Sequence, residues 1–312
     1  PQDYFVAVSS EGEIAVYSGS SPDANTGSDV WSLVGHFQIG KVLGPRAFIR
    51  VNQDFWILTQ QGIVPMSALF QTDPEQALNI VSQKINPLIS QYATQVSLSE
   101  MWGGFFWAQG RRVYVLLPDS TTSATMLVYS IDTKAWTQFA LYIGDHAVAI
   151  TRAFNLPFYG STTGIIYQGE TGYADAVTPT SSGTAVTFAM RGAFSFYGAR
   201  GNYKAFKDIR PLIKVKRGVS FSLGLDTDFN RKQIDTTVTT VSSSFTPWGS
   251  TSGTPTFTPW GSPWSADVTY VYDRHAVSGQ GHCAAIRFGG SIKNSSLQII
   301  GFEVRYDLGG QV

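Results

Sequence analysis

Apolar and polar residues alternate in short runs along most of the chain, and residues that favour turns separate these runs. Alternation with a period of two is typical of a half-buried β-strand. The clearest runs are Tyr4 to Ser9, Glu13 to Tyr17, Phe55 to Thr59, Phe105 to Ala108, Val113 to Leu117 and Met126 to Ile131. Ser10-Glu11-Gly12 and Gln109-Gly110-Arg111 fall where tight hairpin turns are expected. The pattern therefore predicts an all-β fold of short strands.

One stretch, residues 73–93, departs from this alternation and predicts a helical insertion. Thr72-Asp73-Pro74-Glu75 supplies a capping side chain, a proline for the first turn and acids for the positive end of the helix dipole. Pro87 interrupts the pattern, so we expect a kink or two short helices. The apolar face at helical spacing consists of Ala77, Val81, Ile85, Leu88 and Tyr92.

Groups of residues in the first half of the chain recur in the same order after roughly 105 residues, about twice the length of one β-propeller blade. The first set is Val16-Tyr17-Ser18, Trp31, Ile39-Gly40, Arg46-Ala47-Phe48 and Gln60-Gln61-Gly62-Ile63, and the second is Val128-Tyr129-Ser130, Trp136, Ile143-Gly144, Arg152-Ala153-Phe154 and Thr162-Thr163-Gly164-Ile165. Small sheets that bury their faces only against their neighbours repeat their wedges and turns in this way. The repeat predicts β-propeller-like blades in pairs. The alternative is a chance match of common β residues in another all-β architecture.

The character of the sequence changes near residue 190, so we expect two parts. Residues 1–190 should form the propeller-like blades with the helical insertion. Residues 191–312 should form a C-terminal β-rich, sandwich-like part that completes the propeller or forms a platform. Between residues 191 and 217 the only acid is Asp208. The bases that make up the candidate basic strip are Arg200, Lys204, Lys207, Arg210, Lys214, Lys216 and Arg217.

This basic strip has three interpretations. It can dock a neighbouring subunit, or it can contact DNA through its local positive field. It can also be a solvated strand edge whose charges block unwanted sheet pairing. Our functional hypothesis is that this basic strip docks a neighbouring subunit.

A second candidate contact region lies in residues 236–265, which are rich in Ser, Thr, Gly and Pro and contain Phe-Thr-Pro-Trp-Gly-Ser twice. Trp248, Trp260 and Trp264 are the candidate contact aromatics, because large amphipathic side chains are favoured at interfaces with proteins and glycans. The alternative is that these tryptophans fold back and cover an open end of the domain.

Charge and cysteine content narrow the classes of function. The chain has 22 Lys plus Arg against 22 Asp plus Glu, and 14% of its residues are charged, which argues against general phosphate binding by bulk charge. A hydrophobic content of 43% is sufficient for a globular fold. The one cysteine, Cys283, allows neither an internal disulfide nor a cysteine metal cluster. No apolar run approaches the ~20 residues that span a bilayer, so we expect no membrane insertion.

The sequence lacks the common catalytic motifs, including the phosphate-binding loop, the dinucleotide fingerprint and the nucleophile elbow. Its four histidines, His36, His146, His275 and His282, contain no pair at helical ligand spacing. His282 beside Cys283 is not a nucleophile and base pair, because adjacent strand residues point to opposite faces. Paired carboxylates for glycoside hydrolysis could come from different blades, but the sequence selects no pair. We expect no enzymatic activity and no cofactor.

Asp226, Asp228 and Asn230 match the first, third and fifth positions of a calcium-binding loop. Arg231 stands in place of the required glycine, and Thr237 stands in place of the bidentate glutamate. A turn at a strand end, held by aspartate side chains, is the better interpretation. We therefore expect no metal site.

Several motifs together point to a known family. They are Val8 to Tyr17, Asp54 to Thr59 with Gly62-Ile63-Val64-Pro65, Lys84-Ile85-Asn86-Pro87, Val128-Tyr129 with Trp136, Phe158-Tyr159-Gly160-Ser161 with Gly164-Ile165-Ile166-Tyr167, and Lys204 to Pro211. Over most of its length the chain resembles the β-propeller-bearing tail proteins of short-tailed bacteriophages. These are the tail nozzle, or tail tubular protein B, and the packaged-DNA stabilisation proteins of the head-to-tail connector.

The resemblance implies a virion structural protein of the phage tail, assembled in the host cytoplasm and without enzymatic activity. It implies a ring of copies, commonly a hexamer, around the channel through which DNA leaves. The implied partners are further copies, neighbouring tail or head-to-tail adaptor proteins and double-stranded DNA in transit, with the host cell surface as a further candidate. Family members are longer than this chain, and Pro1 runs directly into a strand-like segment, so we expect a processed or truncated product.

A different class of function competes with this hypothesis. The chain could be a receptor-binding or glycan-binding β-propeller of a tail spike or a lectin. In that case Trp248, Trp260 and Trp264 would be the platforms on which sugars stack.

Overall fold

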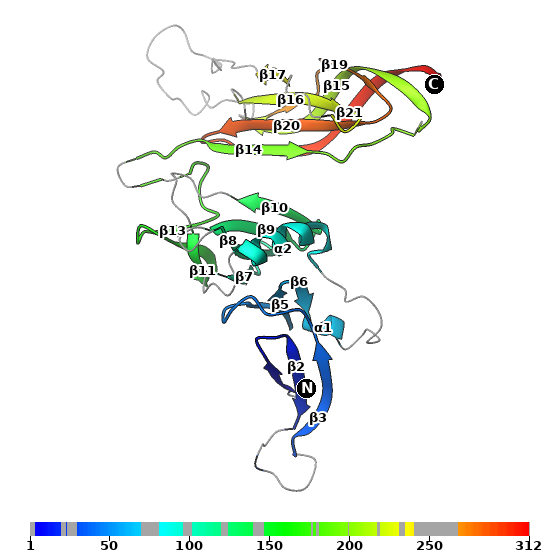
Figure 1. Ribbon diagram of the computed structural model, residues 1–312. Helices are drawn as coiled ribbons and strands as arrows, with labels where there is room; N and C mark the ends of the chain where they lie inside the picture. The colour runs from blue at the N-terminus through cyan, green and yellow to red at the C-terminus, as the bar shows by residue number, and fades with distance from the viewer. Residues whose placement is uncertain are drawn as a thin grey trace. The chain divides into compact units, whose positions relative to one another are not determined.

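A computed structural model of the 312-residue chain describes residues 4–19, 23, 30–69, 81–95, 102–119, 124–139, 147–175, 177–178, 181–198, 200–216, 219–230, 235–239 and 268–311. The chain divides into two compact units, Pro1–Thr171 and Gly172–Val312. The all-β class is confirmed, because short antiparallel strands dominate both units (Figure 1).

The division between the units precedes the boundary that the sequence predicted at residues 190 and 191. The last strand before that boundary, β14 (Val186–Arg191), pairs along its whole length with β20 (Ala284–Ile292) near the end of the chain. The basic residues that suggested the boundary therefore lie inside the second unit and do not mark its start.

The first unit contains four small antiparallel sheets that follow one another along the chain, from blue to green in Figure 1. In each sheet, every strand pairs with the next strand in sequence. The first sheet consists of β1 (Tyr4–Val8), β2 (Glu13–Ser18) and β3 (Ser32–Gln38), and the second of β4 (Phe48–Val51), β5 (Asp54–Thr59) and β6 (Gly62–Pro65). The third consists of β7 (Gly103–Trp107), β8 (Arg112–Pro118), β9 (Ala124–Ser130) and β10 (Ala135–Phe139), and the fourth of β11 (Ala147–Ala153), β12 (Leu156–Ser161) and β13 (Ile166–Gln168).

The internal repeat of the sequence corresponds to a repeat of these sheets. Strands β2 and β3 match β9 and β10, and β4 to β6 match β11 to β13. An aromatic pair recurs in a different register: Trp136 lies opposite Tyr129, with ring centroids 4.9 Å apart, whereas Leu33 lies opposite Tyr17, and Trp31, 6.2 Å from Tyr17, precedes β3. The turns after β4 and β11 also match, since each begins with a residue of positive φ. The repeated residues do not all hold the same register, since Phe48 begins β4 whereas Phe154 lies in the turn after β11, so the paired-blade interpretation stays a prediction.

Helical residues lie between the second and third sheets. They form α1 (Met66–Leu69), a 3-10 turn η1 (Gln83–Ile85) and α2 (Asn86–Gln95). Pro87 occupies the first turn of α2, where a missing N–H breaks no helical hydrogen bond. The predicted helix start at Thr72 lies outside the described residues. The described part of the predicted apolar face, at Val81, Ile85, Leu88 and Tyr92, packs against the core.

Two hydrophobic clusters join the four sheets in sequence. The larger cluster joins the first, second and third sheets and includes Val16, Trp56, Ile63, Val113 and Leu127. The smaller cluster joins the third and fourth sheets and consists of Tyr114, Leu116, Ala124, Met126, Val128 and Tyr159. Each sheet thus buries its faces against its neighbours along the chain, as the repeat requires.

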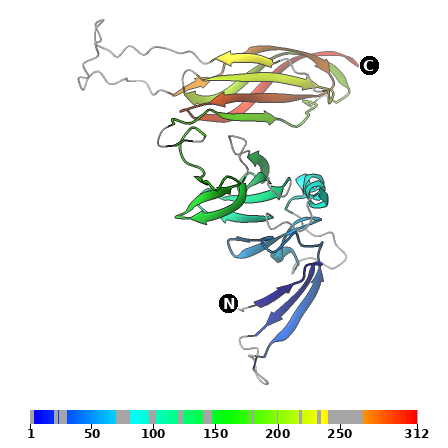
Figure 2. The same ribbon diagram turned by 60° about the vertical axis from the view of Figure 1, so that its left-hand side comes forward.

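The second unit is a sandwich of two sheets around one core, and Figure 2 shows its two layers. The first layer runs in the order β14, β20, β16 (Ser220–Thr227) and β17 (Asp235–Thr239). In the second layer, the long strand β15 (Asn202–Lys216) pairs on one side with β21 (Leu297–Gln311) and on the other with β18 (Val268–Val271) and β19 (His275–Gly281). This agrees with the sandwich-like part that the sequence predicted.

Within the described part of the chain, no helix is long and apolar enough to cross a membrane.

Candidate docking surface

The candidate basic strip lies on and around strand β15, whose core side carries Phe206, Ile209, Ile213 and Val215. The pairing of β15 with β21 shifts register at three places, one of them between Phe206 and Asp208. A bulge of this kind changes which side chains point inward. For this reason the bases of the strip do not all share one surface.

Lys204 is fully buried, with 0% of its surface exposed. Its Nζ donates to the backbone carbonyl of Asn202 at 3.0 Å and to that of His282 at 2.9 Å. The same ammonium lies 5.9 Å from the centroid of the Tyr306 ring, within cation–π range. Lys204 therefore connects three segments of the sandwich. Because it is buried, it cannot contribute to an exposed basic surface, and this part of the prediction is wrong.

Two other bases of the strip are exposed or half-buried, and both pair with acids on β21. Lys207 lies 3.2 Å from Asp307, and Arg210 lies 3.3 Å from Glu303. The Arg210 Nε also donates to the carbonyl of Tyr272 at 2.8 Å. The acids that offset these bases come from the far end of the sequence, so a window around the strip could not reveal them.

Asp208 is the buried centre of this charged network, with 5% of its surface exposed. Arg274 contacts one carboxylate oxygen at 2.8 Å, and Arg305 contacts the other at 2.5 Å. Arg274 also lies 3.7 Å from Glu303. Bases and acids thus alternate across β15 and β21, and the surface does not form a continuous positive field.

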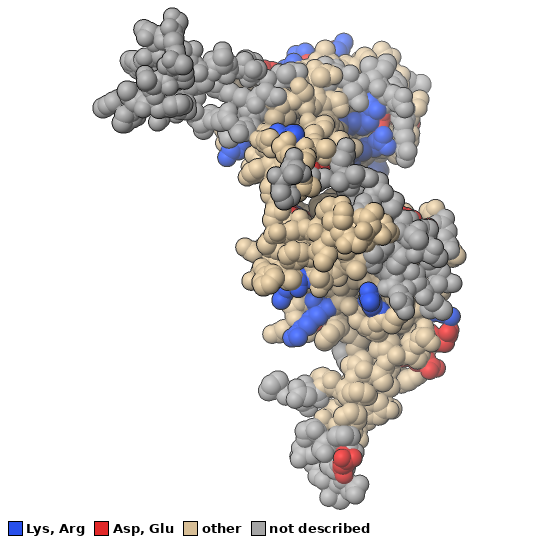
Figure 3. Space-filling model, turned by 90° about the vertical axis from the view of Figure 1, so that its left-hand side faces the viewer, with Lys and Arg blue, Asp and Glu red and all other residues tan. Residues whose placement is uncertain are grey.

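The remaining members of the strip are dispersed. The Arg200 guanidinium lies 5.2 Å above the Phe196 ring, and Lys214 is exposed. The Lys216 side chain and Arg217 lie outside the described part. On the face drawn in Figure 3, lysine and arginine form separate small groups. The contact aromatics Trp248, Trp260 and Trp264 also lie outside the described residues, so their predicted role stays a prediction.

Asp226 forms a second buried ion cluster in the other layer of the sandwich. Its carboxylate is fully buried, 2.9 Å from Arg191 and 3.1 Å from Arg287. These arginines are directly opposite each other on β14 and β20. Since Asp226 is held by two cations, it is not available as a calcium ligand.

Asp228 holds the neighbouring loop in place. Its Oδ1 accepts the backbone N–H of His282 at 2.7 Å and that of Cys283 at 3.1 Å. Burial raises the pKa of Asp228, but the hydrogen bonds from Cys283 and His282 outweigh it and hold the pKa below its usual range. The part of the chain that the structure describes contains no group of three or more metal-ligating side chains.

The thiol of Cys283 is buried, with 1% of the residue exposed. Burial raises its pKa, and the negative charge of Asp228 raises it further. A catalytic thiol needs the opposite shift, because the thiolate is the nucleophile. The Cys283 thiol instead donates to Oδ1 of Asp228 at 3.7 Å.

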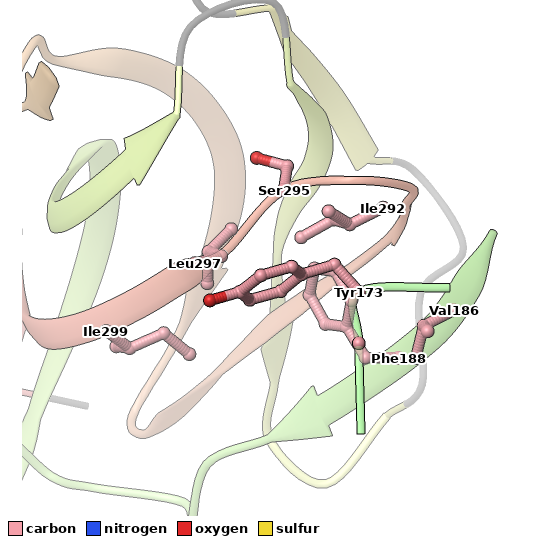
Figure 4. A pocket seen from close by; sticks show the side chains of 8 residues that line it. Tyr173, Val186, Phe188, Ile292, Ser295, Leu297 and Ile299 are labelled. Carbon is pink, nitrogen blue, oxygen red and sulfur yellow. The ribbon is translucent and has the colours of Figure 1, made fainter. Parts of the chain in front are cut away.

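An apolar pocket of about 410 Å³ opens between the edges of the two layers. Figure 4 shows Tyr173 lying across it, with Phe188 of β14 on one side and Leu297 of β21 on the other. No charged side chain lines this pocket. Its lining is mainly apolar, with the hydroxyl groups of Tyr173 and Ser295 as its polar side-chain atoms.

A polar cluster in the first unit connects strand β8 to Glu170, which follows β13. Glu170 accepts a hydrogen bond from Arg112 at 2.6 Å and one from the Tyr114 hydroxyl at 2.5 Å. Burial raises the pKa of Tyr114, and its hydrogen bond to Glu170 raises it further. A neutral tyrosine that donates to a carboxylate already paired with arginine is a stabilising arrangement. Sequence reasoning did not identify this cluster, because Glu170 lies more than 50 residues after Arg112 and Tyr114 of β8.

Searches against models of protein families and against curated proteins found no match to this chain.

Proposed function

We propose that this chain is a structural subunit of a short-tailed phage tail, a nozzle or connector-proximal ring whose copies, commonly six, enclose part of the DNA ejection channel. The observation that carries the proposal is the architecture of the first unit. Its four described sheets follow one another along the chain, and two hydrophobic clusters join each sheet to its neighbours in sequence. Architectures of this kind extend or close by adding further sheets.

The charge distribution supports a conduit for DNA. A protein that neutralises many phosphates binds DNA tightly and in a salt-dependent way, which would retain the DNA during ejection. Here the exposed bases Lys207 and Arg210 are each paired with an acid of β21. A surface of alternating charges can contact DNA in transit without holding it.

The sandwich fits the role of a docking platform for neighbouring tail or adaptor proteins. Its outer charges are ordered by a buried carboxylate, Asp208, and by two arginines that contact it. Charged groups fixed in place contribute mainly to specificity and orientation at an interface. The proposed mechanism is therefore physical: rigid sheets set the bore of the channel and the angle between subunits, and no bond of a substrate is made or broken.

Negative-stain imaging of the purified full chain tests this proposal. We expect closed rings with a central opening, and weak retention of double-stranded DNA on a filter at physiological salt. Single chains without rings would overturn it. Binding of a cell-surface polysaccharide that is lost when Trp248, Trp260 and Trp264 are all replaced by alanine would favour the glycan-binding alternative instead.

A further inference from the structure

Three hairpin turns of the first unit lie together at one end of the third sheet. The turn between β7 and β8 contacts the turn between β9 and β10 through the ion pair of Arg111 with Asp132, and the Arg111 carbonyl accepts the N–H of Ile131 at 3.0 Å. At the end of β7, the Trp107 Nε1 donates at 2.6 Å to the carbonyl of Asn155, in the turn between β11 and β12. The turn cluster defined by these contacts consists of residues 108–111, 131–134 and 154–155.

Phe154 projects from the turn cluster into solvent. Its exposed fraction of 92% is the highest among the large apolar side chains of the described residues. In the two-residue turn between Ala153 and Leu156, φ is 49° at Phe154 and 60° at Asn155. Glycine and asparagine are the usual residues in this turn geometry, and a bulky aromatic residue adopts a positive φ at an energetic cost. Because so exposed a ring gains little packing within the chain to offset this cost, its position points to contact with a partner.

The charged side chains around Phe154 carry a positive excess. Arg152 lies two residues before Phe154 and is exposed, and Lys134 is exposed in the neighbouring turn. The two acids near the cluster, Asp132 and Glu170, are each paired with an arginine. Among the described side chains, two bases therefore remain in excess, and the local field around the exposed ring is positive.

An anionic lipid surface fits this combination better than a protein or DNA does. Phe154 is the one large apolar side chain of the turn cluster that is exposed, and a single apolar group is too little for the buried core of a stable protein interface. Double-stranded DNA offers phosphates to the bases, but its stacked base pairs offer the ring no free face. Binding at a membrane surface needs only a small buried apolar area together with bases that attract anionic headgroups.

We infer that the turn cluster binds an anionic lipid surface, with the Phe154 ring at the boundary of the acyl chains and with Arg152 and Lys134 against the headgroup phosphates. The contact is peripheral and reversible, because one ring and two bases supply far less free energy than a spanning helix does. The ring is already exposed on a tight turn, so binding adds little ordering cost. This inference goes beyond the proposed function and does not depend on the ring of copies, because a single chain carries the whole surface.

Co-sedimentation of the full chain with vesicles of equal parts phosphatidylcholine and phosphatidylglycerol tests the inference. Phe154→Asn removes the apolar ring and places a favoured residue in the turn. It should lower the partition coefficient by about tenfold or more, and the midpoint of urea denaturation should stay the same or rise. Phe229→Asn is the matched control, because Phe229 is 69% exposed with a positive φ of 59° in a turn of the second unit. This control should bind the vesicles like the wild type.

The charge is tested separately from the ring. Arg152→Gln should weaken binding to the same vesicles about fivefold, and added salt should weaken the binding of the wild type. Lys293→Gln, which removes an exposed base of the second unit, should bind like the wild type.

Three results would overturn the inference. The first is a wild-type protein that does not sediment with the anionic vesicles at low salt, and the second is equal binding of the wild type and Phe154→Asn. The third is a double-stranded DNA fragment that displaces the vesicles and binds Phe154→Asn as well as the wild type, which would assign the bases to nucleic acid. None of these results bears on the proposed ring, which imaging tests independently.

Discussion

The two units of this protein bury the faces of their β-sheets in different ways. In the first unit, each small sheet packs against its neighbour along the chain, and two hydrophobic clusters join the four described sheets. In the second unit, two larger sheets face each other around a single core that includes Phe221, Leu223 and Phe288. The first arrangement divides the core among successive sheets, whereas the second shares one core between two layers.

The two units also differ in how they arrange charge. The sandwich fixes charged side chains around the buried carboxylates of Asp208 and Asp226. Large apolar side chains are exposed in both units, such as Phe5 in the first and Tyr173 and Ile300 in the second. The units therefore differ in their cores and buried charges and not in exposed apolar surface. Four substitutions test this comparison, and they follow from the largest expected effect to the smallest.

Phe288→Ala should destabilise the sandwich by about 3–5 kcal/mol, the usual cost of removing a buried aromatic side chain. Phe288 is 2% exposed, and its ring packs against those of Phe188, Phe221 and Phe302. Hydrogen exchange measured peptide by peptide should show faster exchange in β16 and β20 and unchanged protection in β8 and β9. Equal loss of protection in β8 and β9 would contradict the independence of the two cores.

Lys204→Met should cost about 1–3 kcal/mol, because it leaves two buried carbonyl oxygens without their donor. Lys207→Met is the matched control and should change the free energy of unfolding by less than about 0.5 kcal/mol, since an exposed ion pair contributes little. Urea denaturation of both variants measures the difference. Equal effects would show that Lys204 is a surface residue after all.

Tyr114→Phe should cost about 1 kcal/mol at neutral pH, because it removes the hydrogen bond to Glu170. The pKa of Tyr114 is raised in the folded state, so its contribution is complete below the unfolded value of about 10 and is lost as the pH rises through the folded value. The difference in stability between wild type and variant should therefore narrow above about pH 10. Tyr17→Phe should keep the wild-type pH profile; a narrowing there too would implicate general alkaline unfolding.

Asp228→Asn should have the smallest effect, about 0.5–1 kcal/mol at neutral pH after allowance for the partial exposure of the side chain. Asparagine tolerates the positive φ of 47° at this turn, so the substitution removes the charge and keeps the backbone. The folded pKa of Asp228 is lowered, so its contribution is present above about pH 4 and is lost as the pH falls through the folded value.

Urea denaturation between about pH 2 and pH 7 checks this acid dependence. The stabilities of wild type and Asp228→Asn should converge below about pH 3. Asp307→Asn, in an exposed ion pair, is the control and should match the wild type at every pH. A gap between wild type and Asp228→Asn that stays constant down to about pH 2 would show that the carboxylate charge has no part in holding the loop.

The strands and the sandwich-like second part could be predicted because their signals are local. Alternation at Glu13 to Tyr17 or Val113 to Leu117 needs no information about partners. The register of the repeated residues could not be predicted, since Trp136 lies opposite Tyr129 but Leu33 lies opposite Tyr17. The position of the unit boundary could not be predicted, because β14 pairs with β20 from the other end of its unit.

The candidate surface was only partly predictable for the same reason. The sequence identified the bases around β15 but not the acids on β21 that pair with them, nor Arg274 and Arg305 around Asp208. It placed Lys204 with exposed neighbours, whereas bulges in β15 turn that side chain into the sandwich. Contacts between residues far apart in sequence decide these outcomes.

Mass photometry of the full chain across a range of concentrations tests the central claim most directly. The account predicts a closed assembly, most simply six times the 34.0 kDa of one chain. A wild-type protein that stays at 34.0 kDa at every concentration would contradict it.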